Sequence, residues 1–145
     1  MNFKYLDYLP SLPNHLERQA ISLIEGTDLF HSKNDVYKIF DSDQQLKIFF
    51  KDFFDLDVYN IRVQSIYADP KIHIDHNRVE AINYIIAPGG DNVVTSFYND
   101  DLTVIEEIVI EPKKWHKLKI DVKHSVKNIT APPRIAITIH IPIKK

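Results

Sequence analysis

The feature that most constrains the fold of this chain is a change in the pattern of its apolar residues near residue 57. From there on, short runs rich in Val, Ile, Tyr and Thr alternate with residues that favour turns, such as Pro, Gly, Asn and Asp. Many short strands separated by turns are typical of an antiparallel barrel or jelly roll. The runs predict strands at about 57–67, 71–75, 80–87, 93–98, 103–110, 117–126 and 134–141.

The residues before this point carry helical signals instead. Asn14 followed by Glu17 matches a capping box, and apolar residues then recur at helical spacing until Gly26, a typical helix stop. A second capping box, Ser42 with Gln45, predicts a helix through the phenylalanines that follow it. Two helices followed by a series of strands predict an α+β domain that is mostly β.

The composition fits one globular domain over residues 1–145. The chain is 44% hydrophobic and 26% charged with a formal net charge of −2, so it shows no basic character that would favour a nucleic acid. We expect a helical part at about 13–54 to pack on one outer face of a barrel at about 57–143. No apolar segment has the length of a signal peptide or a membrane span, which predicts a cytoplasmic protein without a membrane partner.

Three polar side chains interrupt the predicted strands where apolar residues are expected. The chain has no cysteine, so His, Asp and Glu are its strong metal ligands. Side chains two residues apart on a strand share a face, which places His73 and Asp75 on the same side. His124 lies in an otherwise apolar row of the predicted strand 117–126. These three residues are therefore candidate metal ligands, contributed by separate strands.

Arg134 is the fourth polar position that requires an explanation. It shares one face of the last predicted strand with Ala136, Thr138 and His140, while isoleucines alternate on the other face. If the first face points into the barrel, an unpaired guanidinium there would be costly. We therefore expect Arg134 to hold a carboxylate or phosphate group, which a guanidinium can grip with two parallel hydrogen bonds.

The ordered set of His73-x-Asp75, His124 and Arg134 resembles the motif of the Fe(II)- and 2-oxoglutarate-dependent oxygenases, and the resemblance covers about residues 65–141. It implies a double-stranded β-helix, the jelly roll of that family and of the cupins. By the same resemblance, His73, Asp75 and His124 bind Fe(II), and Arg134 binds the far carboxylate of 2-oxoglutarate. The implied activity is hydroxylation of a small molecule or an amino-acid residue by dioxygen, with release of succinate and carbon dioxide.

Further contacts to the cosubstrate stay open at this point. Many members of the family have Ser or Thr two residues after the Arg, where this chain has Ala136. Asn83, Tyr84 and Thr138 are the candidates to take over that contact. Asn83 and Tyr84 point to opposite faces of their strand, so at most one of them enters the pocket. His76 points away from His73, and we expect it at the mouth of the barrel.

Two other functions compete with the oxygenase hypothesis. A cupin-like metal-dependent enzyme would use the same barrel without 2-oxoglutarate, which would leave Arg134 without an evident partner. A jelly-roll binding module would carry these histidines without catalysis, and its purified form would hold no metal. His116, which follows the Lys113-Lys114 pair, is expected at the surface.

Overall fold

The computed structural model describes residues 2–26, 32–34, 36–55, 60–75 and 78–142. Most elements in this part of the chain are strands, and two helices lie among the first of them. In chain order they are β1 (Phe3–Tyr5), α1 (Asn14–Gly26), β2 (Ser32–Lys33), β3 (Tyr37–Asp41), α2 (Gln44–Phe50), β4 (Asn60–Ile66), β5 (Arg78–Ala87), β6 (Val94–Tyr98), β7 (Val104–Ile108), β8 (Trp115–Lys119), β9 (His124–Lys127) and β10 (Arg134–Pro142).

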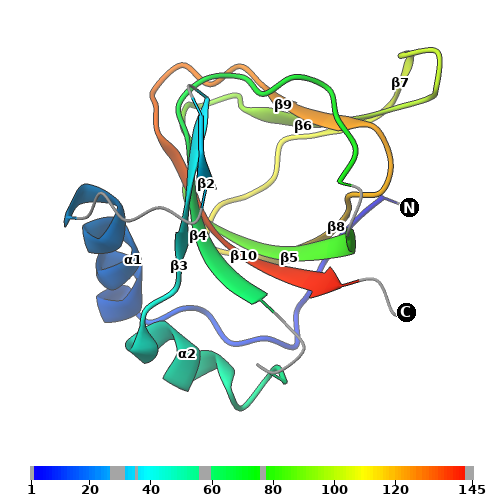
Figure 1. The fold of residues 1–145 in the computed structure, drawn as a ribbon. Helices are drawn as coiled ribbons and strands as arrows, with labels where there is room; N and C mark the ends of the chain where they lie inside the picture. Colours follow the sequence, from blue (N-terminus) through cyan, green and yellow to red (C-terminus); the bar gives the residue numbers. More distant parts are fainter. Residues whose placement is uncertain (1, 27–31, 35, 56–59, 76–77, 143–145) are drawn as a thin grey trace.

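The strands form two antiparallel sheets that face each other (Figure 1). The large sheet has the strand order β1-β8-β5-β10-β4-β3-β2, and the small sheet has the order β7-β6-β9. Some neighbouring strands are distant in the sequence, as β10 lies between β4 and β5 and β9 lies beside β6. This arrangement confirms the predicted jelly roll, and both helices lie against one outer face of it (Figure 1).

The main hydrophobic core lies between the outer face of the large sheet and the N-terminal segments. Ile135, Ile137 and Ile139 of β10 point into this core, where they join Tyr84 and Trp115. The side chains from α1 and α2 that complete it are Leu16, Ala20, Leu46 and Phe50. Burial of these apolar surfaces fixes the helices on the sheet. In the described residues, neither helix is long and apolar enough to span a membrane.

The opposite row of β10 points between the two sheets, as its alternation predicts. Arg134, Ala136, Thr138 and His140 are all buried there. A second, smaller apolar cluster occupies part of the same space and includes Ala81, Ile85, Phe97, Leu118 and Ile120. The large sheet is therefore covered on both faces, by helices outside and by the small sheet inside.

The predicted strand 117–126 differs from the structure, which contains two strands in its place. β8 ends at Lys119 in the large sheet, and β9 begins at His124 in the small sheet. Residues 120–123 connect the two sheets. Their sequence, Ile-Asp-Val-Lys, continues the alternation of a strand, so the sequence gives no sign of this break. The positions of Leu118 and His124 differ by an even number, and both side chains line the cavity between the sheets.

The N-terminal part also differs in detail. Asp43, not Ser42, caps α2, because its side chain accepts a hydrogen bond from the Leu46 N–H at 3.0 Å. The helix ends at Phe50, and turns follow it. The strands β1, β2 and β3 were absent from the sequence-based prediction. They extend the large sheet at its two edges and are short, between two and five residues.

His116 is buried, which corrects the expectation that it lies at the surface. Trp115 and His116 point to opposite faces of β8, and because both faces of the sheet are covered, both side chains are buried. Burial lowers the pKa of His116 from 6.5 to about 4, and the charge of Arg134 acts in the same direction. The Lys114 carbonyl, 3.3 Å from Nδ1, opposes this shift.

A tight turn closes the barrel over Arg134. Gly89 has a φ of +84°, and a Cβ atom at this position would lie 2.9 Å from the Cβ of Arg134. The Gly89 carbonyl also accepts hydrogen bonds from Thr130 and Ala131. Glycine is thus required here both for its left-handed backbone and for the close approach of β10.

We expect Gly89→Ala to lower the free energy of unfolding by about 1 to 3 kcal/mol, because the side chain combines backbone strain with a clash. Chemical denaturation followed by circular dichroism measures this change. The matched control is Gly26→Ala at the end of α1, where no atom lies within 4 Å of the added Cβ. Equal stability of the two variants would contradict this account of the turn.

His116 predicts a pH dependence of stability. Its pKa is lower in the folded chain, so between pH 6.5 and 4 the unfolded chain binds more protons, and stability falls as the pH falls. The loss across this range is about 3 kcal/mol. In His116→Gln, denaturation curves at pH 7 and 4.5 should differ less than in the wild type. The exposed residue His15 gives the control, since His15→Gln should keep the wild-type difference.

Candidate metal centre

The candidate site is built on a short antiparallel pairing between two distant segments. The His73 N–H donates to the His124 carbonyl at 3.1 Å, and the His124 N–H donates to the His73 carbonyl at 3.0 Å. A third hydrogen bond, 2.9 Å long, joins the Asp75 N–H to the Ile120 carbonyl. Residues 73–75 are thereby fixed beside β9, and directly paired residues project their side chains to the same face.

This pairing brings the three predicted ligands together. The Nε2 atoms of His73 and His124 lie 3.9 and 3.7 Å from the two carboxylate oxygens of Asp75. The two imidazole rings are 4.4 Å apart between centroids. One ligand atom from each residue can be chosen so that all three lie within 4.8 Å of one another. The convergence expected from the sequence is therefore present in the fold, whereas metal binding itself stays a prediction.

Both imidazoles are oriented by the main chain. Nδ1 of His73 lies 2.7 Å from the Lys71 carbonyl, and Nδ1 of His124 lies 2.7 Å from the Val122 carbonyl. Because a carbonyl can only accept, each Nδ1 carries a proton, and in the neutral form of the ring the lone pair is then on Nε2. This is the outer hydrogen bond that metal-binding histidines usually make, and it points the free lone pair toward Asp75.

The donor set fits a divalent transition metal. Two imidazoles and one carboxylate form a facial triad that leaves coordination positions open for other ligands. Two atoms bound to one ion at about 2.1 Å lie roughly 3.0 to 3.4 Å apart. The three ligand atoms lie within 4.8 Å of one another, so the widest pair would have to close by up to about 1.8 Å. Burial lowers the pKa of His124, and the neighbouring His73 acts in the same direction. His124 is therefore kept in the neutral form that binds metals.

The site opens on one side to solvent and on the other to a large cavity. The side chains of His73, Asp75 and His124 are 44%, 35% and 11% exposed, so His124 is the innermost of the three. The cavity between the sheets has a volume of about 680 Å³, which is the size of a small-molecule site. Asn83 and Thr138, two of the predicted cosubstrate contacts, also line it.

Arg134 lies in a smaller, neighbouring cavity of about 50 Å³. Asn83 and five other residues line both cavities, so the two spaces are adjacent. Arg134 is 6% exposed, and burial lowers its pKa to about 10. Among the residues that the structure describes, its hydrogen-bond partner is the Pro88 carbonyl, 3.0 Å from Nη1, and no carboxylate pairs with it. Its remaining donors could bind an anion.

Tyr84 is placed differently from its expected role. It points to the helical side of β5, packs against Trp115 and donates a hydrogen bond to Glu17 at 3.3 Å. Asn83, its neighbour, points into the cavities instead, so the choice that the sequence left open favours Asn83. This placement corrects the hypothesis that Tyr84 contacts a cosubstrate. His76, expected at the mouth, lies outside the described residues.

Two cavity residues escaped the sequence analysis. Arg62 of β4 and Arg78 of β5 both line the large cavity. Arg62 stands between Ile61 and Val63, which point into the outer core, so its charge falls on the inward row of an otherwise apolar strand. The same argument that singled out Arg134 could have found it. Arg78 gave no such signal, because it directly precedes the strand predicted at 80–87.

The comparison with known proteins supports the fold. No protein-family model matches the chain, and no curated protein sequence matches it either. Oxalate decarboxylase from Bacillus subtilis, an enzyme with Mn(II) centres, matches in structure with a TM-score of 0.54 at 14% identity, over 85% of this chain and 29% of that one. The Lactobacillus farciminis enzyme, solved with formate, gives 0.51 at 14% identity, over 79% and 31% of the two chains.

The chain therefore spans less than a third of the length of these oxalate decarboxylases. At 14% identity, the similarity to these two enzymes concerns the fold alone. Together with the two facing sheets, this likeness shows that the chain has the fold of a jelly roll, and the His-Asp-His cluster lines the cavity between the sheets.

Proposed function

We propose that this protein is a metal-dependent enzyme whose centre is formed by His73, Asp75 and His124. The observation that carries the proposal is the convergence of two Nε2 atoms and one carboxylate, with both Nδ1 atoms held by backbone carbonyls. A histidine with a purely structural role in the core would not require a second histidine and a carboxylate close to its Nε2 atom. The adjacent cavity offers room for a substrate.

The residues around such a site would have separate roles. His73, Asp75 and His124 hold the ion, and the paired backbone of residues 73 and 124 keeps their spacing. A bound divalent ion supplies a Lewis acid with open positions, or, if redox-active, a site for dioxygen. The walls of the cavity exclude bulk water from the side opposite the mouth and orient the substrate.

Within this class we favour an oxygenase that uses Fe(II) and 2-oxoglutarate, and Arg134 is the observation that supports it. A buried guanidinium without a carboxylate partner in the described residues fits the far carboxylate of that cosubstrate. Asn83 lies between the two cavities and is suited to a further contact. Dioxygen would be the co-reactant, and a small molecule or amino-acid residue would be hydroxylated with release of succinate and carbon dioxide.

The second candidate is a metal-dependent enzyme that does not use 2-oxoglutarate. It is favoured by the likeness in fold to oxalate decarboxylase, whose Bacillus subtilis form has Mn(II) centres. In that case Mn(II) or another divalent ion would occupy the same three ligands. The two candidates share the metal centre and differ in what Arg134 binds, so the experiments below separate them.

We expect the purified protein to bind one divalent ion, measured anaerobically with Fe(II) or by calorimetry with Mn(II). His73→Ala and His124→Ala should each weaken binding by more than about 100-fold, beyond the cost of losing an outer hydrogen-bond partner. The matched control is His15→Ala on α1, which should bind the ion as the wild type does. Unchanged affinity in both ligand variants would refute the metal centre.

We expect the protein loaded with Fe(II) to develop a visible charge-transfer absorption when 2-oxoglutarate is added without oxygen. Arg134→Gln should raise the concentration of 2-oxoglutarate needed by about tenfold or more, since a charge-assisted pair is lost, and should leave the affinity for the metal unchanged. If the wild type binds iron and the absorption never develops, the second candidate replaces the oxygenase.

A further inference from the structure

The inner face of the large sheet carries a continuous polar row opposite the metal centre. Directly paired residues across β3, β4, β10, β5 and β8 are Asp41, Arg62, Thr138, Asn83 and His116, in that order. Three of them, Arg62, Thr138 and Asn83, line the large cavity. A polar row inside a jelly roll is costly unless its groups find partners, so its composition indicates what the cavity holds.

Arg62 is only partly engaged by the protein. Its Nη1 lies 2.9 Å from Asp41, whose side chain is 62% exposed, so this ion pair is weakened by solvent. Nε of Arg62 is buried and has no hydrogen-bond partner among the described residues. Since the guanidinium carries five N–H groups, part of its donor set faces the cavity without being used.

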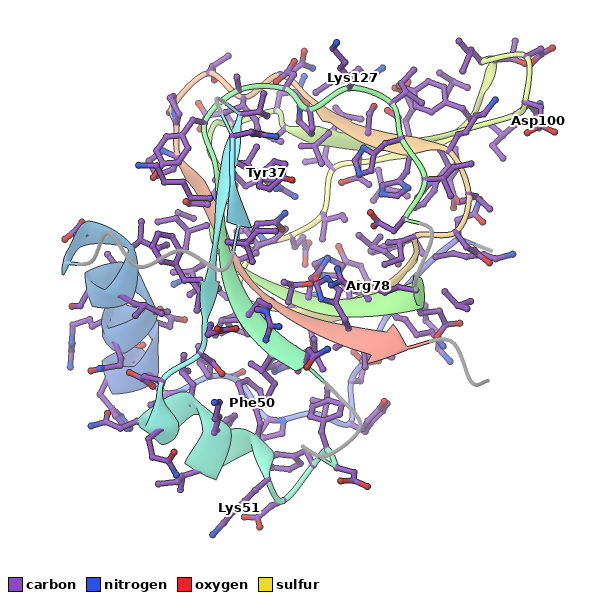
Figure 2. All side chains as sticks on the ribbon, in the orientation of Figure 1. Tyr37, Phe50, Lys51, Arg78, Asp100 and Lys127 are labelled. Atoms are coloured by element: carbon purple, nitrogen blue, oxygen red, sulfur yellow. The ribbon has the colours of Figure 1, made fainter. Side chains whose placement is uncertain are left out.

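Arg78 approaches the same space from the beginning of β5 (Figure 2). Its Nη1 lies 3.2 Å from Nε2 of His140, and because a guanidinium can only donate, His140 accepts. Burial lowers the pKa of Arg78, the charge of Asp75 opposes this effect, and the charge of Arg62 adds to it. The partner of Arg78 is therefore an imidazole nitrogen without a proton. The guanidinium is also close enough to Arg62 and Asp75 for their charges to affect its pKa.

Among the described residues that line the large cavity, cations outnumber carboxylates. Arg62, Arg78 and Lys71 line it together with Asp75, and Asp41 pairs with Arg62 from beside the cavity. A divalent ion held by Asp75 would add two more positive charges. Such a concave positive surface attracts anions.

We propose that Arg62 and Arg78 together bind an oxyanion of the substrate, a carboxylate or a phosphate group, inside the large cavity that the metal ligands also line. The proposal rests on the proposed function, because it assigns the substrate class of that centre. It is separate from the cosubstrate contact, since Arg134 lies in the smaller cavity. A small organic acid or a phosphorylated metabolite would thus be oriented by the two guanidinium groups while its reactive carbon faces the metal.

The test uses metal-free protein, so that an anion cannot bind through the ion, and calorimetric titration with inorganic phosphate and with malonate. The wild type should bind at least one of these probes, and the tighter of the two identifies the oxyanion. Arg62→Gln and Arg78→Gln should each weaken this binding by about tenfold or more, whereas Arg78→Lys should weaken it less. Arg18→Gln, at an exposed position of α1, should leave it unchanged.

Arg62→Gln also removes the ion pair with Asp41, and Asp41→Asn is the control for this effect, because it removes the same ion pair but keeps the guanidinium. This variant should retain oxyanion binding, and thermal unfolding of every variant shows that the fold persists. The inference is overturned if the wild type binds neither probe in a saturable manner, or if Asp41→Asn or Arg18→Gln weakens binding as much as Arg62→Gln does.

Manganese affinity, measured on the same proteins, separates this inference from the proposed function. The arginine variants should bind Mn(II) like the wild type. A wild type that binds the oxyanion but no metal would refute the metal-dependent enzyme and keep the oxyanion site. A wild type that binds metal but no oxyanion would refute only the present inference.

Discussion

The reciprocal backbone pairing of His73 with His124 is the interaction on which the candidate site depends. Two hydrogen bonds of 3.1 and 3.0 Å join a segment outside the named strands to β9. Without this pairing, the first imidazole and Asp75 would have no fixed relation to the second imidazole, although all three would still be present in the chain. Backbone geometry, rather than contact between the side chains, therefore determines the spacing of the candidate ligands.

The alternation of side chains along the strands was sufficient to predict much of this arrangement. It placed Ile135, Ile137 and Ile139 in the outer core and put Arg134 and Thr138 on the inner face, because β10 pairs with β4 without a register shift. It also indicated the His-Asp-His cluster, since His73 and Asp75 share one face and His124 interrupts an otherwise apolar row. Helix α1 followed from the helical spacing of its apolar residues and from Gly26, where the structure ends it. Asn14, however, is the first residue of the helix and not its cap, since the Glu17 N–H donates to the Pro13 carbonyl.

Other features depend on tertiary contacts that alternation does not reveal. Residues 120–123 continue the pattern of a strand but turn between the two sheets, because β8 and β9 belong to different sheets. His116 lies between Lys114-Trp115 and Lys117 in the sequence, which suggested an exposed position, but its side chain is buried between the sheets. Ser42 and Asp43 are both good capping residues, and only the structure shows that Asp43 meets the Leu46 N–H. Arg78 reaches the cavity through the irregular end of β5 at its bulge with β10.

The unequal exposure of the three candidate ligands gives the proposed metal site an inner and an outer side. His124 is nearly covered and already oriented by the Val122 carbonyl, whereas His73 and Asp75 face the mouth. If the three residues hold an ion, His124 would be its innermost ligand, and the short segment that carries His73 and Asp75 would separate it from solvent.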